Sequence, residues 1–312
     1  MADSHGGVKA LLVNLHERTT DGLLTEAAAE HGDRLLTKVR LADVIDVDHL
    51  SGRRKSFALA AHLDFVMVSE ESAIPRFAVE LDGMQHWTDP VTMERDKLKD
   101  ALCKAAQLPL LRITSDFTRK QGRWRALSYI VDAFYFSEAF YDAQESGIIP
   151  LDEPFDVASV IVNIDDAGLM GFNSLDSAVR LRLLNYWKSK KLPHFAPDEY
   201  ITKTADGRVQ AHAFLVVGPD RYLMGRVRVR DFLFQGISPG EIASQLVTAE
   251  VGDLADRWLA GEAVASNSRT VLKAMAEVQE AIDADRFISS FTGGSDLPGS
   301  IRLQFGDAPT AT

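Results

Sequence analysis

Two apolar runs separated by a polar turn constrain the fold of this 312-residue chain more than any other feature. Residues 63–68 (LDFVMV) and 77–81 (FAVEL) are rich in β-branched and aromatic residues, and residues 69–75 between them are typical of a turn. The pattern predicts a β-hairpin. If the hairpin turns at the middle of the polar segment, Asp64 faces Glu80 or the next residue on the neighbouring strand.

The segments around the hairpin predict a sheet flanked by helices. Apolar residues within 91–106 fall on one helical face, which is typical of a surface helix. The other expected elements are a helix at 22–31 that could start near Glu17 and stops at Gly32, an extended segment at 36–47, a basic loop at 53–55, a strand at 108–113 and an aromatic helix at 125–141. The resulting order, α-β-β-β-α-β-α, indicates an α/β domain.

A second, smaller α/β domain is expected after a linker. Gly147, Pro150 and Pro154 lie among acidic residues, which favours a domain boundary there. We therefore expect domains at 1–146 and 147–292, followed by a flexible tail at 293–312. The expected elements of the second domain are a strand at 158–164, a helix at 175–191, a hairpin of 209–217 with 222–230, and helices at 239–248, 253–260 and 268–288.

Composition excludes several classes of protein. With 34 Lys and Arg against 45 Asp and Glu, the net charge is −11, so nucleic-acid affinity would need local basic patches. The lone Cys103 excludes a disulfide framework and a multi-cysteine zinc site, and it fits a reducing compartment. The chain has no run of 18 apolar residues, and its first ten residues lack the apolar core of a signal peptide. A cytoplasmic protein without membrane contact is expected.

Carboxylates gather at one end of the predicted hairpin. Strand alternation places Glu80 and Asp82 on one face, about 7 Å apart, and the hairpin register adds Asp64. Like charges in such a cluster need a cation to balance them, and a set of oxygen ligands suits Mg²⁺ or Mn²⁺. We expect three carboxylates to converge on one hard divalent ion.

Cationic and hydrogen-bonding residues follow directly. Gly83 permits a bend that returns Gln85 and His86 toward the same strand end, and Arg95, Lys97 and Lys99 follow on the next helix. A metal held by carboxylates and surrounded by cations is what phosphodiester hydrolysis requires, because the metal activates water while the cations bind neighbouring phosphates. Each of these cations could equally belong to an ordinary solvated helix face.

These segments together resemble a known family. The string FAVELDGMQHW, preceded by HLDFV and followed by ERDKLKDALCKAAQLPLLRI, resembles the PD-(D/E)XK nuclease superfamily, in particular the domain of unknown function 2726 (DUF2726), which is similar to very-short-patch-repair endonucleases. The phrase KVRLADVI is similar to the family's first strand. The resemblance covers about residues 15–118. It implies a restriction-endonuclease-like mixed sheet flanked by helices, and Mg²⁺-dependent or Mn²⁺-dependent cleavage of DNA, as in bacterial defence or repair.

The resemblance also implies roles for particular residues. Asp64 and Glu80 would be metal ligands, with the Leu81 carbonyl as a further ligand and Glu17 as an outer one. The lysine that the superfamily carries two residues after the acid is replaced by Asp82, which would assist ligation or orient water. Charge balance at the phosphate would then come from His86 and Lys99, with Gln85, Arg95 and Lys97 as further contacts to nucleic acid.

Two features of the second half suit a nucleic-acid backbone. Arg226, Arg228 and Arg230 alternate along a predicted strand, and Lys188 and Lys190 end an aromatic helix. A charged surface paired with the protein's own acids explains them equally well. This domain could also bind a protein partner. The aromatic residues of 129–141 are expected to form core or an interface between copies of the chain.

Two other functions remain open. The missing lysine and the negative net charge favour a catalytically silent nucleic-acid-binding or scaffold subunit of a defence or repair complex. A glycosidase using Glu80 and Asp82 is a weaker alternative, because neighbours on one strand face are an unusual arrangement for that chemistry.

Overall fold

Residues 14–83, 89–121, 124–163, 170–232, 234–294 and 297–298 are described by a computed structural model of the chain. The chain divides into two units. Unit 1 contains Met1–Phe155 and Phe232–Ile237, and unit 2 contains Asp156–Asp231 and Ser238–Thr312. The chain therefore leaves unit 1, returns to it for six residues, and leaves it again.

The boundary after Phe155 lies later than the one expected at residue 146. The Gln144 side chain donates to the carbonyls of Pro150 and Glu153, at 2.6 and 2.8 Å. Phe155 packs on Phe140, with ring centroids 5.4 Å apart. These contacts attach the expected linker to the preceding helix, so it belongs to unit 1.

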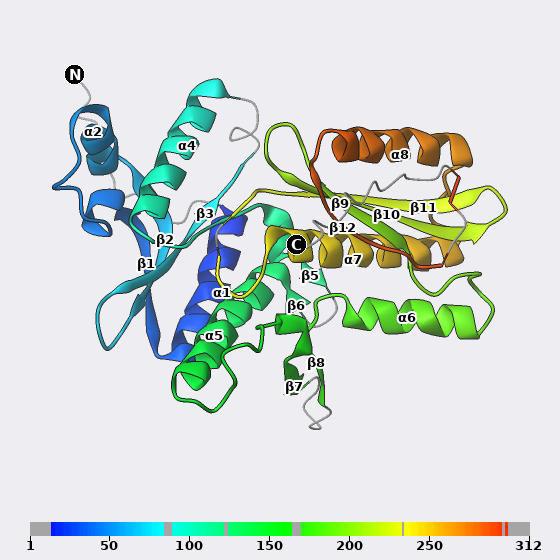
Figure 1. Cartoon of the computed structure of the whole chain (residues 1–312), viewed down its shortest axis with the longest axis horizontal. Helices are drawn as coiled ribbons and strands as arrows, with labels where there is room; N and C mark the ends of the chain where they lie inside the picture. Colours follow the sequence, from blue (N-terminus) through cyan, green and yellow to red (C-terminus); the bar gives the residue numbers. More distant parts are fainter. Residues whose placement is uncertain are drawn as a thin grey trace, which may run out of the picture. The chain divides into compact units, whose positions relative to one another are not determined.

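Unit 1 contains the predicted elements in the predicted order, with the additional helix α2, two 3₁₀ helices and the short strands β5 and β6 (Figure 1). Its elements are α1 (Leu15–His31), β1 (Asp33–Arg40), η1 (Leu41–Asp43), α2 (Gly52–Ala60), β2 (His62–Ser69), β3 (Pro75–Leu81), α4 (Pro90–Ala105), β4 (Leu110–Ile113), η2 (Ser115–Thr118), β5 (Lys120–Gln121), β6 (Trp124–Arg125) and α5 (Ala126–Glu145). Helix α2 stands where a basic loop was expected, because Ala58 is buried in the core and fixes this segment as a helix.

Strands β1 to β4 form a four-stranded mixed sheet in the order β1-β2-β3-β4. The β1–β2 and β2–β3 pairs are antiparallel, and β3–β4 is parallel. The predicted hairpin is confirmed: Phe65 pairs with Val79 and Met67 with Phe77. Ala73 in the turn has a left-handed backbone, with φ of 59°.

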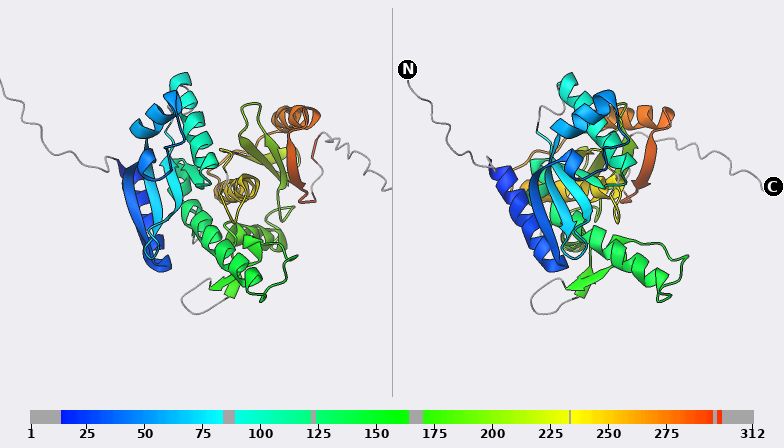
Figure 2. Two further views of the ribbon diagram at one scale, coloured as in Figure 1. Left: turned by 60° about the vertical axis from the view of Figure 1, so that its left-hand side comes forward. Right: turned by 90° about the vertical axis from the view of Figure 1, so that its left-hand side faces the viewer.

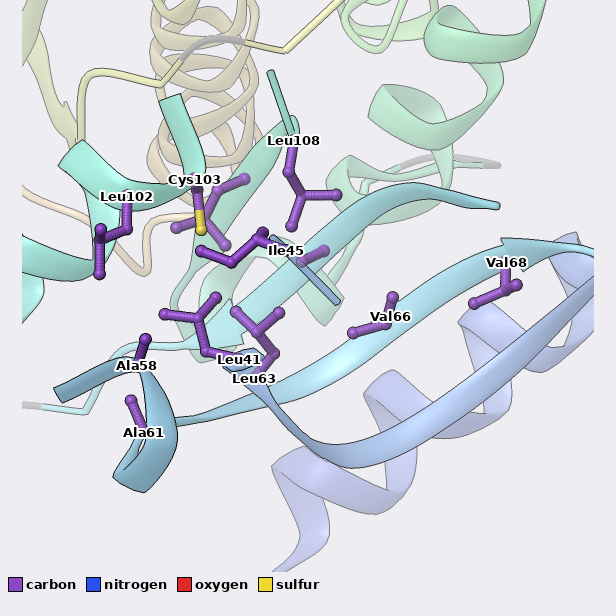
Figure 3. Packing of buried hydrophobic residues seen from close by; sticks show 12 residues of the cluster. Leu41, Ile45, Ala58, Ala61, Leu63, Val66, Val68, Leu102, Cys103 and Leu108 are labelled. Carbon is purple, nitrogen blue, oxygen red and sulfur yellow. The ribbon is translucent and has the colours of Figure 1, made fainter. Parts of the chain in front are cut away.

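Each face of this sheet is covered by helices. On one face, β2 and β3 contribute Val66 and Ala78 to a cluster with Leu102 and Cys103 of α4 (Figure 3). In Figure 3, α1 lies on the opposite side of β1 and β2 from this cluster. There, Phe77 packs edge-on against Phe134 of α5, with centroids 5.0 Å apart. The aromatic residues of α5 are largely buried in the core. A place in the core was one of the two roles expected for them.

Unit 2 is built around an antiparallel sheet in the order β11-β10-β9-β12. Helix α7 covers one face with α6 packed behind it, and α8 lies over the other face (Figures 1 and 2). The elements are η3 (Val157–Ser159), β7 (Ile161–Asn163), β8 (Met170–Phe172), α6 (Ser177–Lys188), β9 (Asp198–Lys203), β10 (Val209–Gly218), β11 (Arg221–Val229), α7 (Pro239–Leu259), α8 (Ser268–Asp283) and β12 (Phe287–Phe291).

Unit 2 differs from the sequence prediction in several elements. Strands β8, β9 and β12 were not expected, and α7 is one helix where two were expected. Gly252 lies in the middle of α7, where a Cβ atom would overlap the side chain of Val179 on α6. This glycine therefore allows close packing of two helices and does not end one. Of the expected tail, only residues 293–294 and 297–298 lie within the described residues.

Among the described residues, no helix combines the length and the apolar character that a membrane span requires.

Candidate active site

One charged residue from each strand of unit 1 lies in a single row across the sheet. The β1–β2 register places Lys38 opposite Asp64, since the pairs on either side of this position are formed. The β2–β3 register continues the row to Glu80, and Glu80 pairs with Arg112 of the parallel strand β4. The order across the sheet is therefore cation, acid, acid, cation. Two acids flanked by two cations can hold a further cation only by competition or rearrangement.

Asp64 and Glu80 are joined through the backbone of the opposite strand. The Asp64 N–H donates to Glu80 Oε1 at 3.2 Å, and the Leu81 N–H donates to Asp64 Oδ2 at 3.0 Å. The last paired residues of the two strands are Phe65 and Val79. At the next position, hydrogen bonds to the two carboxylates thus replace the backbone hydrogen bonds between the strands. These bonds fix both carboxylates at the end of the hairpin.

Lys38 bridges two carboxylates at this end of the sheet. Its Nζ atom lies 2.6 Å from Asp64 Oδ1 and 3.3 Å from Glu17 Oε1. Glu17 is positioned by the capping box of α1, in which its carboxylate also accepts from the Asn14 N–H. Burial by itself lowers the pKa of Lys38, but the hydrogen bonds and charges of Asp64 and Glu17 outweigh it, so the pKa is raised. Lys38 is therefore a charged ammonium between two acids.

Lys99 of α4 reaches the second acid. Its Nζ atom donates to Glu80 Oε2 and to the His62 carbonyl, both at 2.7 Å. Burial raises the pKa of the Glu80 carboxyl, although the charge of Lys99 opposes this. The sequence placed Lys99 near the site, and the structure brings it into direct contact with Glu80.

Asp82 has a different partner from the one that the sequence predicts. We expected Asp82 to converge with Asp64 and Glu80 on one ion. Instead, Arg112 Nη1 lies 3.3 Å from Asp82 Oδ1 and 3.7 Å from Glu80 Oε2, so the cation shared by these two acids is a guanidinium. Arg112 also pairs with Asp96 and Asp100 of α4. Its side chain is only 3% exposed, so Arg112 acts as a structural ion-pair partner of these acids.

The remaining predicted residues of unit 1 are distributed differently. Arg95 and Lys97 are exposed on α4, and within the described part of the chain neither forms an ion pair. Gln85 and His86 lie outside the described residues. The Leu81 N–H donates to Asp64.

Two acids suit a hard divalent cation by their chemistry. Over the described ranges, no group of three or more His, Cys, Asp or Glu residues has the geometry to hold a metal ion. Mg²⁺ is commonly bound through one or two carboxylates, with water and substrate phosphates completing its ligands. Asp64 and Glu80 provide two carboxylates, and each already attracts an ammonium, Lys38 on one and Lys99 on the other. The two carboxylates therefore suit a hard cation by their chemistry, and Lys38 occupies Asp64 Oδ1 in this structure.

The predicted nucleic-acid contacts of unit 2 fall in two places. Arg226 and Arg228 extend from β11 on the face that carries Gln210, and Arg230 follows directly after this strand. Lys188 and Lys190 are exposed at the end of α6, and Lys190 lines a pocket of about 430 Å³ together with Trp187.

Sequence reasoning missed two residues at the site. Lys38 lies within the strand KVRLADVI, and strand alternation could have placed it near Asp64 once the β1–β2 register was known. His16 in the first turn of α1 has a buried Nε2 atom without a hydrogen-bond partner among the described residues. Burial lowers the pKa of His16, while the charges of Glu17, Asp116 and Asp64 act in the opposite direction. Neither residue carries a local sequence signal.

Comparison with known protein families gives a match to the first part of the chain. Residues 9–127 match the model of the family described as "Protein of unknown function (DUF2726)". This match covers most of unit 1 and includes the whole row of charged residues. No curated protein and no solved structure matches the chain.

Proposed function

We propose that unit 1 is a metal-dependent nuclease domain that hydrolyses phosphodiester bonds of DNA. The observation that carries the proposal is that Asp64 and Glu80 lie opposite each other at the end of the β2–β3 hairpin, with an ammonium 2.6 Å from one carboxylate and 2.7 Å from the other. Two acids that can hold a hard cation beside two lysines provide the charges that phosphodiester cleavage requires.

The architecture supports the same proposal. The mixed sheet with its parallel fourth strand, covered by α1 and α5 on one side and by α2 and α4 on the other, is what a restriction-endonuclease-like PD-(D/E)XK domain requires. Asp82 stands at the position of the superfamily lysine, and it is paired with Arg112. Lys99 and Lys38 reach the acids from other elements, so we propose that they replace the charge of that lysine.

Each residue has a distinct part in the proposed reaction. Asp64 and Glu80 would hold the metal, which when bound activates water and neutralises charge at the phosphate. Lys99 opposes the rise in the pKa of Glu80 that burial causes, and it holds this carboxylate in place, because Lys99 is itself fixed by the His62 carbonyl. Lys38 is one-third exposed and has a flexible stem, so it can leave Asp64 and approach a phosphate oxygen. The exposed Arg95 and Lys97 of α4 would bind neighbouring phosphates.

Purified full-length protein tests this proposal directly. Supercoiled plasmid, linear duplex DNA, single-stranded DNA and RNA would each be incubated with Mg²⁺, Mn²⁺ or EDTA. We expect DNA cleavage that requires metal and that is lost by at least a hundredfold in Asp64→Asn and in Glu80→Gln. Asp43→Asn is a matched control, because Asp43 is exposed and pairs with Arg40. Full activity in the Asp64 and Glu80 variants would refute the proposal.

A catalytically silent nucleic-acid-binding or scaffold module is the second candidate. A specific observation favours it: all four oxygens of Asp64 and Glu80 already accept a bond from Lys38, Lys99 or a backbone N–H. A metal at Asp64 would compete with Lys38 for this carboxylate. Calorimetric titration with Mn²⁺ separates the two candidates, since absence of heat together with absence of plasmid nicking would support the silent module.

A further inference from the structure

A second cationic site lies on the sheet of unit 2, on the face that α8 partly covers. The β10–β11 register places Gln210 directly opposite Arg228, and His212 directly opposite Arg226. Directly opposed residues of antiparallel strands project from the same face, so these four side chains form two adjacent rows. Strand β11 lies at the edge of its sheet, beside β10. The two arginines are therefore on the strand nearest the edge.

Both arginines bind one oxygen atom. Gln210 Oε1 accepts from Arg228 Nε at 2.6 Å, and from Arg226 Nη2 and Nε at 2.9 and 3.2 Å. Gln210 is neutral, so two positive charges converge on an acceptor that carries no compensating charge. Such a convergence is costly by itself and becomes favourable when an anion binds between the guanidinium groups.

His212 fixes the orientation of this acceptor. Its Nε2 atom lies 2.6 Å from Gln210 Nε2. Since the Gln210 oxygen faces the arginines, its amide N–H₂ group must donate to an unprotonated His212 Nε2. His212 is buried and its ring lies parallel to that of Phe214. The pair of arginines is thus held by a rigid, buried support.

Arg226 and Arg228 differ in the charged groups that surround them. Arg226 Nη2 pairs with Glu277 of α8 at 2.8 Å, and the Arg226 side chain is 44% exposed. Arg228 is exposed, and in the part of the chain that the structure describes it forms no ion pair. The guanidinium of Arg228 is therefore oriented by Gln210 and available to an external anion.

We propose that Arg226 and Arg228, held by Gln210 and His212, form a phosphate-binding site for the backbone of a nucleic acid. A planar guanidinium offers paired N–H donors that match phosphate oxygens, and an oriented guanidinium loses less entropy on binding than a free one. An exposed position on an edge strand suits an extended polyanion. This site goes beyond the hydrolytic function proposed for unit 1, and it rests on residues of unit 2 alone.

Fluorescence anisotropy of the full-length protein with labelled 20-nucleotide DNA and RNA, single-stranded and duplex, tests the proposal. All titrations are carried out in EDTA, so that binding is measured independently of any hydrolysis. We expect Arg228→Gln to weaken binding about tenfold and to reduce the slope of log affinity against log salt by about one. Arg221→Gln removes the same charge from the same strand, outside the Gln210 contacts, and is expected to change affinity less than twofold.

Gln210→Glu tests the geometry with an isosteric change. A carboxylate at this position would pair with both arginines and cancel one of their two positive charges, so we expect a loss of affinity at least as large as that of Arg228→Gln. Hydrogen-exchange protection of β10 verifies that the variant is folded. Equal weakening by Arg221→Gln and Arg228→Gln, or unchanged binding in Gln210→Glu, would overturn the proposal. Binding of inorganic phosphate or a free nucleotide at this site, without binding of any oligonucleotide, would overturn the assignment to a nucleic-acid backbone.

Discussion

Lys38 has a backbone conformation that residues other than glycine rarely adopt. Its φ of 53° lies in the left-handed region, in the interior of β1, at a cost of about 1–2 kcal/mol. The hydrogen bonds to Asp64 and Glu17 stabilise the residue in this conformation. Strained residues of this kind are frequent at functional sites, and this one lies at the point where a cation would bind. Lys38 therefore combines a strained backbone with a side chain that would compete with a metal ion for Asp64.

We predict that Lys38→Ala separates metal binding from cleavage. Removing the ammonium frees Asp64 for a divalent ion, so Mn²⁺ affinity should rise several-fold, which corresponds to about 1 kcal/mol. DNA cleavage should fall by about a hundredfold, because a cation near the phosphate is lost. Calorimetry with Mn²⁺ and plasmid nicking measure the two effects. Lys104→Ala removes an exposed lysine of α4 and serves as the control. Unchanged Mn²⁺ affinity in Lys38→Ala would exclude competition between the two cations.

His212 predicts how the stability of unit 2 depends on pH. Burial, together with Arg226 and Arg228, lowers the pKa of His212 to about 4, compared with 6.5 for an ordinary histidine. The unfolded chain therefore binds a proton at a pH where the folded chain does not, so stability falls as the pH is lowered from about 6.5 to about 4. The shift corresponds to a loss of up to about 3 kcal/mol.

His212→Gln keeps an acceptor for Gln210 and removes the titration. We expect this variant to lose less stability than the wild type between pH 7 and pH 4, as measured by urea unfolding. His49→Gln is the matched control, because the side chain of His49 is 66% exposed. Parallel pH profiles for wild type and His212→Gln would show that the histidine does not govern acid sensitivity.

At the scale of elements, the β2–β3 hairpin was predictable and the neighbours of its acids were not. A polar turn and alternating apolar residues predict the hairpin and bring Asp64 opposite Glu80 or the next residue, and the structure selects Glu80. Lys38 and Arg112 come from strands whose register depends on tertiary packing. Arg112 in particular lies on a parallel strand that follows the crossover helix α4, and no local pattern specifies such a register.

The position of Asp82 illustrates the same limit. Strand alternation correctly places Asp82 on the same face as Glu80. The contacts of both side chains with Arg112 confirm this placement. Arg112 could be read from the sequence as an ion-pair partner, but no pattern assigned it to these two acids, so a metal was expected between them. In unit 2, likewise, β12 pairs with β9 over a long sequence distance and escaped prediction, whereas the β10–β11 hairpin did not.

Arg112 joins β4, β3 and α4, and we predict that Arg112→Met destabilises unit 1 by about 3–5 kcal/mol. The substitution leaves Glu80, Asp82 and Asp96 without the cation they share in a buried position. Urea unfolding followed by circular dichroism measures the effect. Arg40→Met breaks an exposed pair with Asp43 and should change stability by less than about 1 kcal/mol. Similar losses in both variants would contradict a structural role for the Arg112 network.

At the scale of the whole molecule, sequence reasoning located two parts of the chain but assumed that each is continuous. Phe232–Ile237 belongs to unit 1 although it lies between segments of unit 2. Gly236 explains how this segment fits: its φ is 88°, and a Cβ atom there would overlap the carbonyl of Ala133 on α5. Only tertiary structure reveals this return, because six residues are too few to form a recognisable pattern.

Phe234 is the residue through which the returning segment joins the core of unit 1. Its ring packs against Phe77 and Phe134, with centroids 5.2 Å from each. We predict that Phe234→Ala destabilises unit 1 by about 3 kcal/mol, the usual cost of removing a buried aromatic ring. Hydrogen exchange in the full-length protein should show faster exchange in β2 and β3. Phe195→Ala removes a ring that is 45% exposed and should leave these strands unchanged. If β2 and β3 keep their protection in Phe234→Ala, unit 1 folds from its continuous N-terminal segment, and the returning segment adds no stability to it.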